Sequence, residues 1–519
     1  MSKSTPKHLF DIRDYGASCA DGVINTRAIQ SAVDACHQAG GGVVYCPPGI
    51  FITGTVWLKS HVTLYVEAGC TLLGSPRRED YEESLPFPES VVFAEEKTSA
   101  AHLFIAYRAE NVTISGRGVI DGNGPAFLPH LTSTAAYPSG YWDWRPGQMV
   151  FFCLCQDVHV EGIALNNSPY WTLFFHGCTG VQVHGVAIAN GWNTPNGDGI
   201  DVDCCRNVCL DSCRINSGDD CITLRAHSTP LGAEAQPCEN VMVTNCTLRT
   251  RCNAVRVGVG EGLIRNCVFS NLVIHESHIG LNVVANWAAS SSGAQIQQVR
   301  FANLVIDAAI PFYLALGSGG ATASVKDLAL VEIDARGTAA AFIGGTRDVP
   351  LSTVTLRNVD LVVSGGTRNS ARETAFDSGL SEGEIFGLGL PYGLCLAEAQ
   401  DLLLEGVRVR WGETTGPWQH AVFARNVEGL VFSRVEATTP PSANAGAAAL
   451  HCVHCAGLAL HACRAAQGAT RFLSVEESPA GATVHLLGND FTQATEAVVC
   501  DAPVLESGNL FSDAPAGSL

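Results

Sequence analysis

Basic residues are scarce in this chain of 519 residues, in which 31 Lys and Arg face 50 Asp and Glu and the formal net charge is −19. A surface with so few cations has no face that can neutralise many phosphates, so we expect no nucleic acid as a partner. Charged residues make up only 16% of the chain and glycine occurs 53 times, which favours short strands and tight turns over a helical bundle. The 46% apolar content can form a large core, which excludes disorder as the main state.

Long hydrophobic runs are missing as well. No stretch of 18 apolar residues occurs, so we expect no membrane-spanning segment and no membrane partner. Residues 1–7 are polar and no apolar segment typical of a signal peptide follows them. These features predict a soluble, cytoplasmic protein.

The sequence also lacks the spacings of a metal site or a disulfide framework. The 16 histidines show no ligand spacing and the 21 cysteines no paired C-x-x-C pattern, so we expect neither a metal nor another cofactor. The cysteine count is odd and includes the adjacent pair Cys204 and Cys205. Both features favour free thiols that fill the core in a reducing compartment.

A short phrase recurs from residue 111 onward. It consists of a turn residue, a strand of alternating apolar residues, a bend at Asn, Gly or Cys, and a second short strand. The valine after the turn falls at 112, 158 and 181, which we interpret as two periods of 23 residues and then one. The copies are NVTISGRGVI from Asn111, DVHVEGIAL from Asp157, GVQVHGVAI from Gly180, NVCLDSCRI from Asn207, NVMVTNCTL from Asn240, LIRNCVFSNLVI from Leu263, QVRFANLVI from Gln298, VTLRNVDLVV from Val354, LLLEGVRVRW from Leu402 and LVFSRVEA from Leu430.

A repeat of this length made only of strands predicts an all-β fold, a parallel β-helix whose coils stack at about 4.8 Å. Horseshoe and paired-helix solenoids need helical segments and a propeller blade needs a longer repeat, so both are excluded. An antiparallel sandwich with coincidental spacing is the remaining alternative. The open end of the coil stack needs a cover, and we expect an amphipathic helix over 26–38 to supply it, with Ile29, Val33 and Cys36 on one face and Gly40 after its end.

Two acidic clusters lie in consecutive coils: Asn196-Gly-Asp198 and Ser217-Gly-Asp219-Asp220. Asp198 and Asp219 are 21 residues apart, close to one coil, so we expect them in stacked positions with neighbouring carboxylates. Crowded carboxylates raise the pKa of at least one of them, which suits an acid and a base acting across a glycosidic bond. Aspartate is also a common turn residue, and we favour that interpretation for Asp201 and Asp203.

At this point the sequence resembles glycoside hydrolase family 28, the polygalacturonase and rhamnogalacturonase family of right-handed parallel β-helices. The resemblance runs from about residue 10 to about residue 310 and rests on the order and spacing of several fragments. They are DYGA at Asp14, AIQSAVDAC from Ala28, GGGVVYCPPGIFITGTVWLKSHVTLYVEAGCTLLGS from Gly40, IDGNG from Ile120, Arg145 with Pro146, NNSPYWTLFF from Asn166, NGDGID from Asn196 and SGDDCITL from Ser217.

The resemblance implies roles for the acids. The family's Asn-x-Asp motif matches Asn196 and Asp198, and its paired aspartates match Asp219 and Asp220. Asp219 would then be the general acid, and Asp198 with Asp220 would activate a water on the opposite face, which inverts the anomeric centre. Stacking at about 4.8 Å by itself is closer to the spacing of retaining pairs, so inversion rests on the resemblance.

Two of the family's substrate-binding motifs are replaced. Arg251, Cys252 and Asn253 stand in place of Gly-His-Gly, and the segment 280–284 contains Asn282 and Val284 where the family has Arg-Ile-Lys. We therefore expect atypical substrate recognition. Cys252 fits a buried ladder position better than a nucleophile, because no His lies near it in sequence.

Substitute substrate-binding residues are available in the neighbouring coils. Guanidinium and amide donors can hold a sugar carboxylate or hydroxyl, and aromatic rings can stack on a sugar face. The candidates are Asn196, Arg225, Arg251, Asn253, Arg256, Trp142 and Trp192.

We expect one domain over residues 1–519. Its parts are a cap and first coils to about 105, catalytic coils over about 106–310, and C-terminal coils and loops over about 311–519. Polar, glycine-rich segments at 228–237, 287–296 and 364–385 are predicted to be loops that build the walls of a groove.

The expected function is that of an inverting, exo-acting glycoside hydrolase whose partner is an oligosaccharide of the pectin type or a related glycan. One alternative is a β-helix lyase or uronate epimerase, which needs a base together with a cation that quenches the uronate charge. Another is a carbohydrate-binding protein on a degenerate hydrolase scaffold, which the replaced histidine favours and the three retained acids disfavour. The sequence gives no indication of oligomeric state.

Overall fold

The computed structural model of the chain describes residues 8–90, 98–128, 144–286, 292–317, 322–365, 389–416, 418–441 and 446–512. Its contacts form two compact units: unit 1 comprises Met1–Val255 with Gly262–Ile264, and unit 2 comprises Arg256–Glu261 with Arg265–Leu519. Strands in both units pair in parallel, in register, coil after coil. The fold is the right-handed parallel β-helix that the sequence predicts. A single domain over 1–519 stays a prediction.

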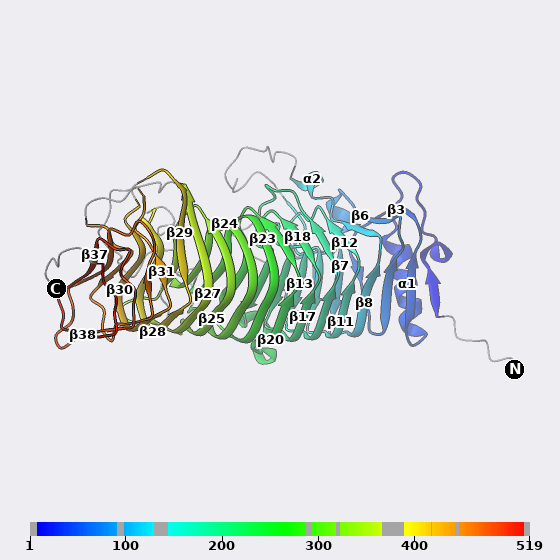
Figure 1. Cartoon of the computed structure of the whole chain (residues 1–519). Helices are drawn as coiled ribbons and strands as arrows, with labels where there is room; N and C mark the ends of the chain where they lie inside the picture. Colours follow the sequence, from blue (N-terminus) through cyan, green and yellow to red (C-terminus); the bar gives the residue numbers. More distant parts are fainter. Residues whose placement is uncertain are drawn as a thin grey trace. The chain divides into compact units, whose positions relative to one another are not determined.

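Three stacks of parallel strands form the coils of unit 1 (Figure 1). Stack A contains β4 (Val56–Trp57), β7 (Phe104–Tyr107), β10 (Val150–Cys153), β13 (Leu173–His176), β16 (Ile200–Asp203) and β19 (Ile222–Ala226). Stack B contains β1 (Leu9–Asp11), β2 (Gly42–Cys46), β5 (Val62–Val66), β8 (Glu110–Gly116), β11 (Gln156–Glu161), β14 (Thr179–His184), β17 (Arg206–Asp211) and β20 (Cys238–Thr244). Stack C contains β3 (Gly49–Thr53), β6 (Cys70–Gly74), β9 (Val119–Asp121), β12 (Ala164–Asn166), β15 (Ala187–Ala189), β18 (Arg214–Ser217) and β21 (Thr247–Thr250). Strand β22 (Asn253–Gly260) follows β21.

The register confirms the alignment of the repeated valines but corrects one interval. Val158 pairs with Val112 on one side and with Val181 on the other. The 46 residues from Val112 to Val158 are therefore one coil, where two periods of 23 were expected. An excursion that leaves after β9 lengthens this coil, because a loop between two stacked strands changes the sequence spacing without changing the register.

The turn residue that opens each repeat has a left-handed backbone. Its φ is 52° at Asn111, 54° at Asp157, 73° at Gly180, 56° at Asn207 and 57° at Asn240. Glycine, asparagine and aspartate enter this region most readily, which explains why they recur there. The asparagine side chains also pair between coils, and Asn240 Nδ2 donates to Asn207 Oδ1 over 3.1 Å.

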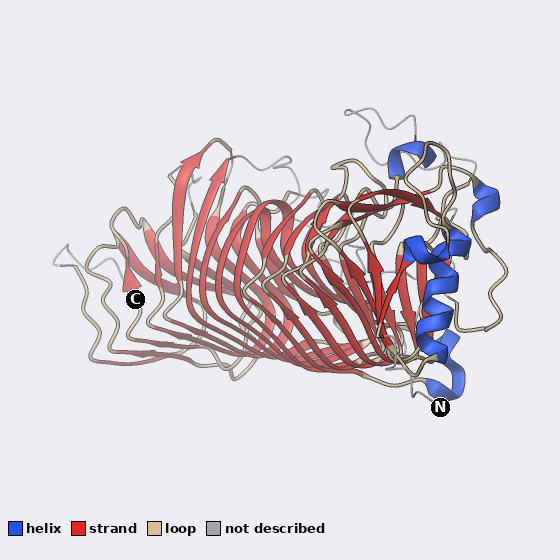
Figure 2. Ribbon diagram, turned by 90° about the vertical axis from the view of Figure 1, so that its right-hand side faces the viewer, coloured by secondary structure: helices blue, strands red, loops and turns tan. Residues whose placement is uncertain are grey.

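The helical elements described in unit 1 are α1 (Thr26–Gln38), α2 (Gly124–Phe127), and the 3₁₀ turns η1 (Ile12–Tyr15), η2 (Arg78–Asp80) and η4 (Thr229–Glu234). Helix α1 buries Ile29, Ala32, Val33 and Cys36 and packs against β1 and β2. It lies across the N-terminal end of the unit 1 coils (Figure 2), which confirms the predicted cap. The 3₁₀ turn η4 occupies the predicted loop at 228–237.

Unit 2 continues the same architecture with longer strands. Its described strands are β23 (Leu263–Asn286, whose first two residues belong to unit 1), β24 (Gln295–Gly317), β25 (Ser324–Gly337), β26 (Ala341–Gly344), β27 (Leu351–Gly365), β28 (Tyr392–Glu405), β29 (Arg408–Thr414), β30 (His420–Ser433), β31 (Glu436–Ala437), β32 (Leu450–Val453), β33 (Ala459–His461), β34 (Arg464–Ala465), β35 (Arg471–Glu476), β36 (Val484–Leu487), β37 (Glu496–Cys500) and β38 (Val504–Ser507). Most of the predicted loops at 287–296 and 364–385 lies outside the described residues, and their ends at 295–296 and 364–365 belong to β24 and β27.

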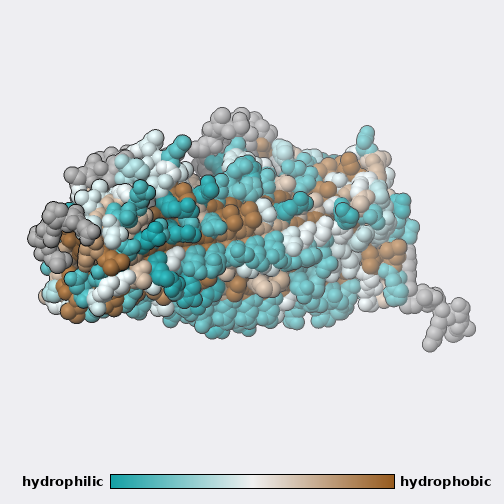
Figure 3. Space-filling view, viewed as in Figure 1, coloured by the Kyte–Doolittle hydropathy of each residue, from teal (hydrophilic) through white to brown (hydrophobic). Residues whose placement is uncertain are grey.

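The residues follow the alternation expected of half-buried strands. Hydrophilic residues dominate the face over β8, β11 and β17 (Figure 3), while Val158, Val160, Val208 and Leu210 of β11 and β17 point into the coil. All 21 cysteines are free thiols and most are buried, so they fill the core as predicted. No helix in the described ranges is long and apolar enough to cross a membrane.

Candidate active site

The acidic clusters occupy the turns that lead from stack C into stack A. Asp198 lies two residues before β16, and Asp220 lies two residues before β19. Ile200 pairs with Ile222, and the Gly199 N–H donates to the Asp220 carbonyl over 2.8 Å. The stacked partner of Asp198 is therefore Asp220, and the expected pairing with Asp219 is wrong, because this coil has 22 residues and Asp219 precedes the aligned position.

Four residues share this turn position in successive coils. The Thr172 N–H donates to the Asp198 carbonyl over 3.0 Å, and the Cys221 N–H donates to the Asn253 carbonyl over 2.9 Å. With the bond between Gly199 and Asp220, these contacts align Trp171, Asp198, Asp220 and Asn253, a set we call the turn column. The turn column thus stacks an aromatic ring, two carboxylates and an amide, all of them buried.

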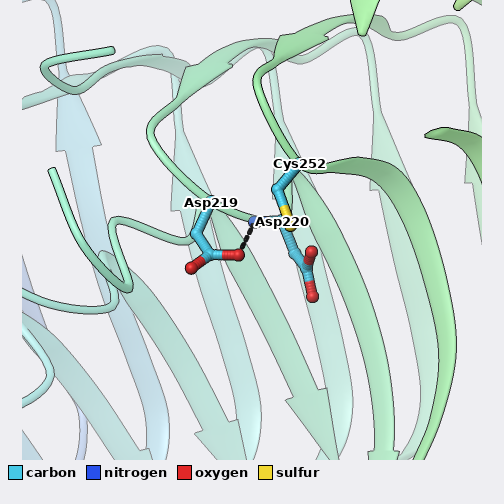
Figure 4. Close-up of side chains that lie close together, drawn as sticks. All are labelled: Asp219, Asp220 and Cys252. Carbon is cyan, nitrogen blue, oxygen red and sulfur yellow. Dashed lines mark hydrogen bonds between the residues drawn. The ribbon is translucent and has the colours of Figure 1, made fainter. Parts of the chain in front are cut away.

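Asp219 lies beside the turn column, and backbone donors hold its carboxylate (Figure 4). Its Oδ1 accepts from the Asp220 N–H over 3.1 Å, and its Oδ2 accepts from the Asn196 N–H over 3.2 Å. The Asp219 carbonyl accepts bonds from the hydroxyls of Ser217 and Thr250. The backbone of Asp219 is therefore fixed from its own coil and from the next one, while its side chain keeps a small exposed area.

Asp220 is held by the residue that stacks on it. Asn253 Nδ2 donates to Asp220 Oδ1 over 2.6 Å and to Cys252 Sγ over 3.4 Å. Asp219, Asp220 and Cys252 each offer one ligand atom, and these atoms lie within 4.8 Å of one another, which makes them the group in the described part of the chain that could hold a metal ion (Figure 4). The set mixes a soft sulfur with hard carboxylate oxygens, which suit different metals, and we assign no metal to it.

Arg225 of β19 contacts two carboxylates and one aromatic ring. Its Nε lies 2.7 Å from Asp201 Oδ1, its Nη2 lies 3.4 Å from Asp198 Oδ2, and its Cζ lies 4.0 Å from the centre of the Trp171 ring. Burial opposes the charge of Arg225, but the carboxylates outweigh burial and raise the pKa of the guanidinium. Arg225 was expected among the substrate-binding residues. These contacts show that two of its nitrogens bind the carboxylates of Asp198 and Asp201.

Asp201 and Asp203 are strand residues, so the expectation that they are turn aspartates is wrong. Both lie in β16, and neither is exposed to a significant extent. Burial raises the pKa of Asp201 to about 6 although Arg225 opposes the shift. Burial also acts against the charge of Asp203, but the neighbouring His176, 3.1 Å away, and the His227 N–H outweigh it and lower the pKa of Asp203. Polar residues at alternate positions of an apolar strand were the sequence signal for both.

Arg145 fixes the loop that carries Asn196, a role that sequence reasoning missed. The guanidinium is fully buried, and its Nη1 donates to the carbonyls of Pro169 over 3.0 Å and Pro195 over 2.7 Å. Its Nη2 donates to Asn196 Oδ1 over 2.7 Å. Asn196 itself has a left-handed backbone with φ 52°, so its N–H can turn toward Asp219. The fragment Arg145-Pro146 was the available signal.

The other expected substrate-binding residues lie at different places. Trp192 is 37% exposed, and the guanidinium of Arg249 lies 4.3 Å from its ring centre. Arg251 Nη1 donates to Asn193 Oδ1 over 2.9 Å, so it contacts the same loop. Arg256 is buried on β22 and belongs to unit 2. Trp142 lies outside the described residues.

The arrangement brings together the groups that acid–base cleavage of an acetal needs. Asp219, Asp198 and Asp220 lie in adjacent turns with different partners: backbone N–H groups, a guanidinium and an amide. Carboxyl groups with different surroundings can hold different protonation states at one pH, so one can donate a proton while another accepts one.

Comparisons with known proteins identify the family of the chain. The model of the glycosyl hydrolases family 28 matches residues 71–375. The exo-poly-alpha-D-galacturonosidase of Dickeya chrysanthemi is 27% identical over 321 residues, which cover 54% of this chain and 52% of that protein. An exopolygalacturonase of Zea mays is 24% identical over 390 residues, which cover 70% of this chain and 85% of that protein. The chain spans about half the length of the first two curated relatives.

Two solved structures share the fold. The family 28 exopolygalacturonase of Yersinia enterocolitica has a TM-score of 0.63 at 20% identity, covering 84% of this chain and 79% of that one. The exopolygalacturonase of Thermotoga maritima has a TM-score of 0.59 at 22% identity, covering 69% and 88%. Because the family match covers more than half of the chain and includes all three acids, the chain belongs to the glycosyl hydrolases family 28.

Proposed function

We propose that the protein is an inverting glycoside hydrolase that removes sugars from the end of a pectin-type oligosaccharide. The observation that carries the proposal is the group of three carboxyl groups, Asp198, Asp219 and Asp220, in adjacent turns of a family 28 β-helix. The names of several relatives, among them exopolygalacturonases, support a pectin-type substrate and exo action.

In the proposed reaction Asp219 donates its proton to the glycosidic oxygen as the bond to the anomeric carbon breaks. Asp198 and Asp220 accept a proton from a water that attacks the anomeric carbon from the opposite face, which gives a product of inverted configuration. The fixed backbone of Asp219 supports its role, because a general acid must stay within hydrogen-bond reach of one substrate oxygen.

We further propose that Arg251, Asn253 and Trp192 recognise the substrate in place of the family's usual motifs. The exposed ring of Trp192 supports sugar stacking, and the Arg249 guanidinium on the ring adds a cation beside it. Because cations are few and the net charge is −19, we expect short oligosaccharides to be better substrates than long polygalacturonate. The buried thiols support a reducing compartment, so we keep the cytoplasm as the proposed location.

The test is Asp219→Asn, assayed by release of reducing sugar from pectin-type oligosaccharides of defined length. We expect turnover to fall by about 10² to 10⁴-fold with unchanged folding, since the amide cannot donate the carboxyl proton. Asp157→Asn is the matched control: Asp157 is an exposed stack B residue whose left-handed backbone suits Asn, and its activity should equal that of the wild type.

The reaction type is settled by the products. Proton NMR of the fresh product shows the anomer first formed, and an inverted anomer supports the proposal. Formation of an unsaturated uronide, detected by its ultraviolet absorbance, would identify a lyase. Binding of the oligosaccharides without any turnover would identify a binding protein. Near wild-type activity of Asp219→Asn would show that Asp219 is not the general acid.

A further inference from the structure

We propose that Arg225 is a positioning residue that keeps the Asp198 carboxylate ionised and oriented, and that Asp201 holds Arg225 in place for this task. The proposal rests on the proposed function in one respect, namely that Asp198 acts on the attacking water. The contacts among the three side chains are independent of that role.

The guanidinium of Arg225 is fixed on one face and along its edge. The Trp171 ring packs against the face at 4.0 Å, and Asp201 Oδ1 accepts from Nε over 2.7 Å. This leaves Nη2 directed at Asp198 Oδ2, 3.4 Å away. Trp171 and Asp198 are neighbours in the turn column, so the ring and the carboxylate are placed by the same register, and Arg225 reaches both from β19.

Burial makes this contact important for the charge of Asp198. The exposed fraction is 7% for Arg225, 3% for Asp198 and 0% for Asp201. Water cannot stabilise charges at these positions well, so an ionised Asp198 depends on nearby cations and hydrogen-bond donors. Asp220 also faces Arg225, and its negative charge acts against a second carboxylate one coil away.

Asp201 is the group best able to give up its charge. Its Oδ2 is buried and has no hydrogen-bond partner in the described part of the chain. The charges that face Asp201 are those of Arg225, Asp220 and Asp203, and burial with the two carboxylates raises the pKa of Asp201 to about 6 against the effect of Arg225. When Asp201 takes up a proton, the positive charge of Arg225 acts on Asp198 with less competition. Asp198 therefore keeps its charge in more acidic solution.

The same contacts argue against Arg225 as a substrate ligand. A guanidinium that binds a sugar carboxylate bidentately must present a pair of N–H groups to it. In Arg225 the Nε and Nη2 groups already point at Asp201 and Asp198, and the ring of Trp171 lies against one face.

The experiment compares the pH dependence of kcat/KM in Arg225→Gln, Arg225→Lys and Asp201→Asn, using the oligosaccharide that the wild type cleaves best. In Arg225→Gln we expect the acidic limb to move to higher pH, with about tenfold or greater loss near pH 4.5, a smaller loss near pH 7 and little change in KM. Arg225→Lys keeps the cation and should restore part of the shift. Asp201→Asn keeps an oxygen acceptor for Nε and resembles the protonated Asp201 that the wild type has at the pH of this limb, so its acidic limb should stay close to that of the wild type.

An acidic limb that moves to higher pH in Arg225→Gln and stays in place in Asp201→Asn supports the proposal. A raised KM with an unmoved acidic limb in Arg225→Gln would make Arg225 a substrate ligand. If all three variants are less stable but keep the acidic limb of the wild type, Arg225 and Asp201 have only a structural role. If Arg225→Gln does not fold, the Lys and Asn variants still decide, since equal limbs in both would overturn the proposal.

A measurement without substrate separates this proposal from the proposed function. The pKa of Asp201 is raised, so its contribution to stability is full below about pH 4 and is lost as the pH rises through about 6. The Tm of the wild type minus that of Asp201→Asn should therefore fall between about pH 4 and pH 7. A flat difference would overturn the proposal, whereas a protein inactive on every oligosaccharide but with this Tm profile would overturn only the hydrolase function.

Discussion

Two buried aspartates on strand β16 have pKa values shifted in opposite directions because their surroundings differ. Asp201 is buried, one of its oxygens has no hydrogen-bond partner among the described residues, and its pKa rises to about 6. Asp203, two residues later on the same strand, contacts His176 and the His227 N–H, and its pKa falls below the ordinary value. Burial outweighs the effect of Arg225 on Asp201, whereas the groups around Asp203 outweigh burial, so the charged form is favoured for Asp203 and disfavoured for Asp201.

The variant Asp203→Asn tests whether the ionised Asp203 stabilises the folded state. A lowered pKa means that ionised Asp203 adds stability above the ordinary aspartate pKa, and that this stability is lost as the pH falls through the folded-state value. We expect Asp203→Asn to lower Tm by about 2–5 °C near neutral pH, and the difference to narrow below about pH 4. Thermal unfolding followed by circular dichroism at several pH values measures both.

Asp211→Asn is the matched control for that experiment. Asp211 lies 2.8 Å from His184 in an exposed version of the same carboxylate–imidazole pair. Exposed pairs contribute about 0–1 kcal/mol, so the Tm of this variant should stay close to that of the wild type. An effect as large as that of Asp203→Asn would show that burial is not the cause.

At the scale of the element, several coils of unit 1 have a left-handed residue near the start of the stack B strand. Asn207 is such a residue, with φ 56°, and its Oδ1 accepts from Asn240 in the next coil. This conformation bends the chain at the second residue of β17, and the hydrogen bond between the asparagine side chains connects neighbouring coils. A β-branched residue would clash with its own backbone in this region.

Asn207→Val should therefore lower the free energy of unfolding by about 1–3 kcal/mol, and Asn207→Gly by less, because glycine adopts the left-handed backbone without strain. Gln182→Val, at an exposed and ordinary strand position of β14, should leave stability nearly unchanged. Denaturant unfolding of the three variants is the measurement. Equal losses in Val and Gly variants would assign the cost to the lost ladder bond and not to the backbone.

At the scale of the whole molecule, the cysteines are spread over both units and sit in the coil interior and its turns. Cys155, Cys178 and Cys205 follow one another in successive coils, and the Cys178 N–H donates to Cys205 Sγ over 3.2 Å. Burial raises the pKa of Cys221 to about 12. A thiol with such a high pKa is hardly ionised near neutral pH, so it should react slowly while the protein is folded.

Thiol titration tests this property together with the proposed reducing compartment. In the native, unreduced protein we expect a disulfide reagent that releases a coloured thiol to react with a few cysteines. Cys19 should be among them, because its side chain is exposed. After denaturation without reductant nearly all 21 should react. Recovery of only one or two thiols would contradict both the free cysteines and the cytoplasmic location.

The sequence by itself determined the coil, the cap and the acids. Alternating valines, turn residues suited to a left-handed backbone, and an apolar face on 26–38 are local properties, and each predicts its element without knowledge of distant contacts. The acids were found the same way, since Asp198 and Asp219 each follow a glycine in two matching fragments and Asp220 comes directly after Asp219.

Only the tertiary structure decided which residues meet. Asp198 stacks on Asp220 and not on Asp219, because the register follows backbone hydrogen bonds between coils and one residue of difference in coil length changes the partner. Arg225 contacts Asp198 and Asp201 because its strand, β19, pairs with β16. Asp201 is shielded from solvent because other segments of the chain cover it. Charge and spacing are written in the sequence, but burial and partner choice arise from segments that are distant along the chain and adjacent in space.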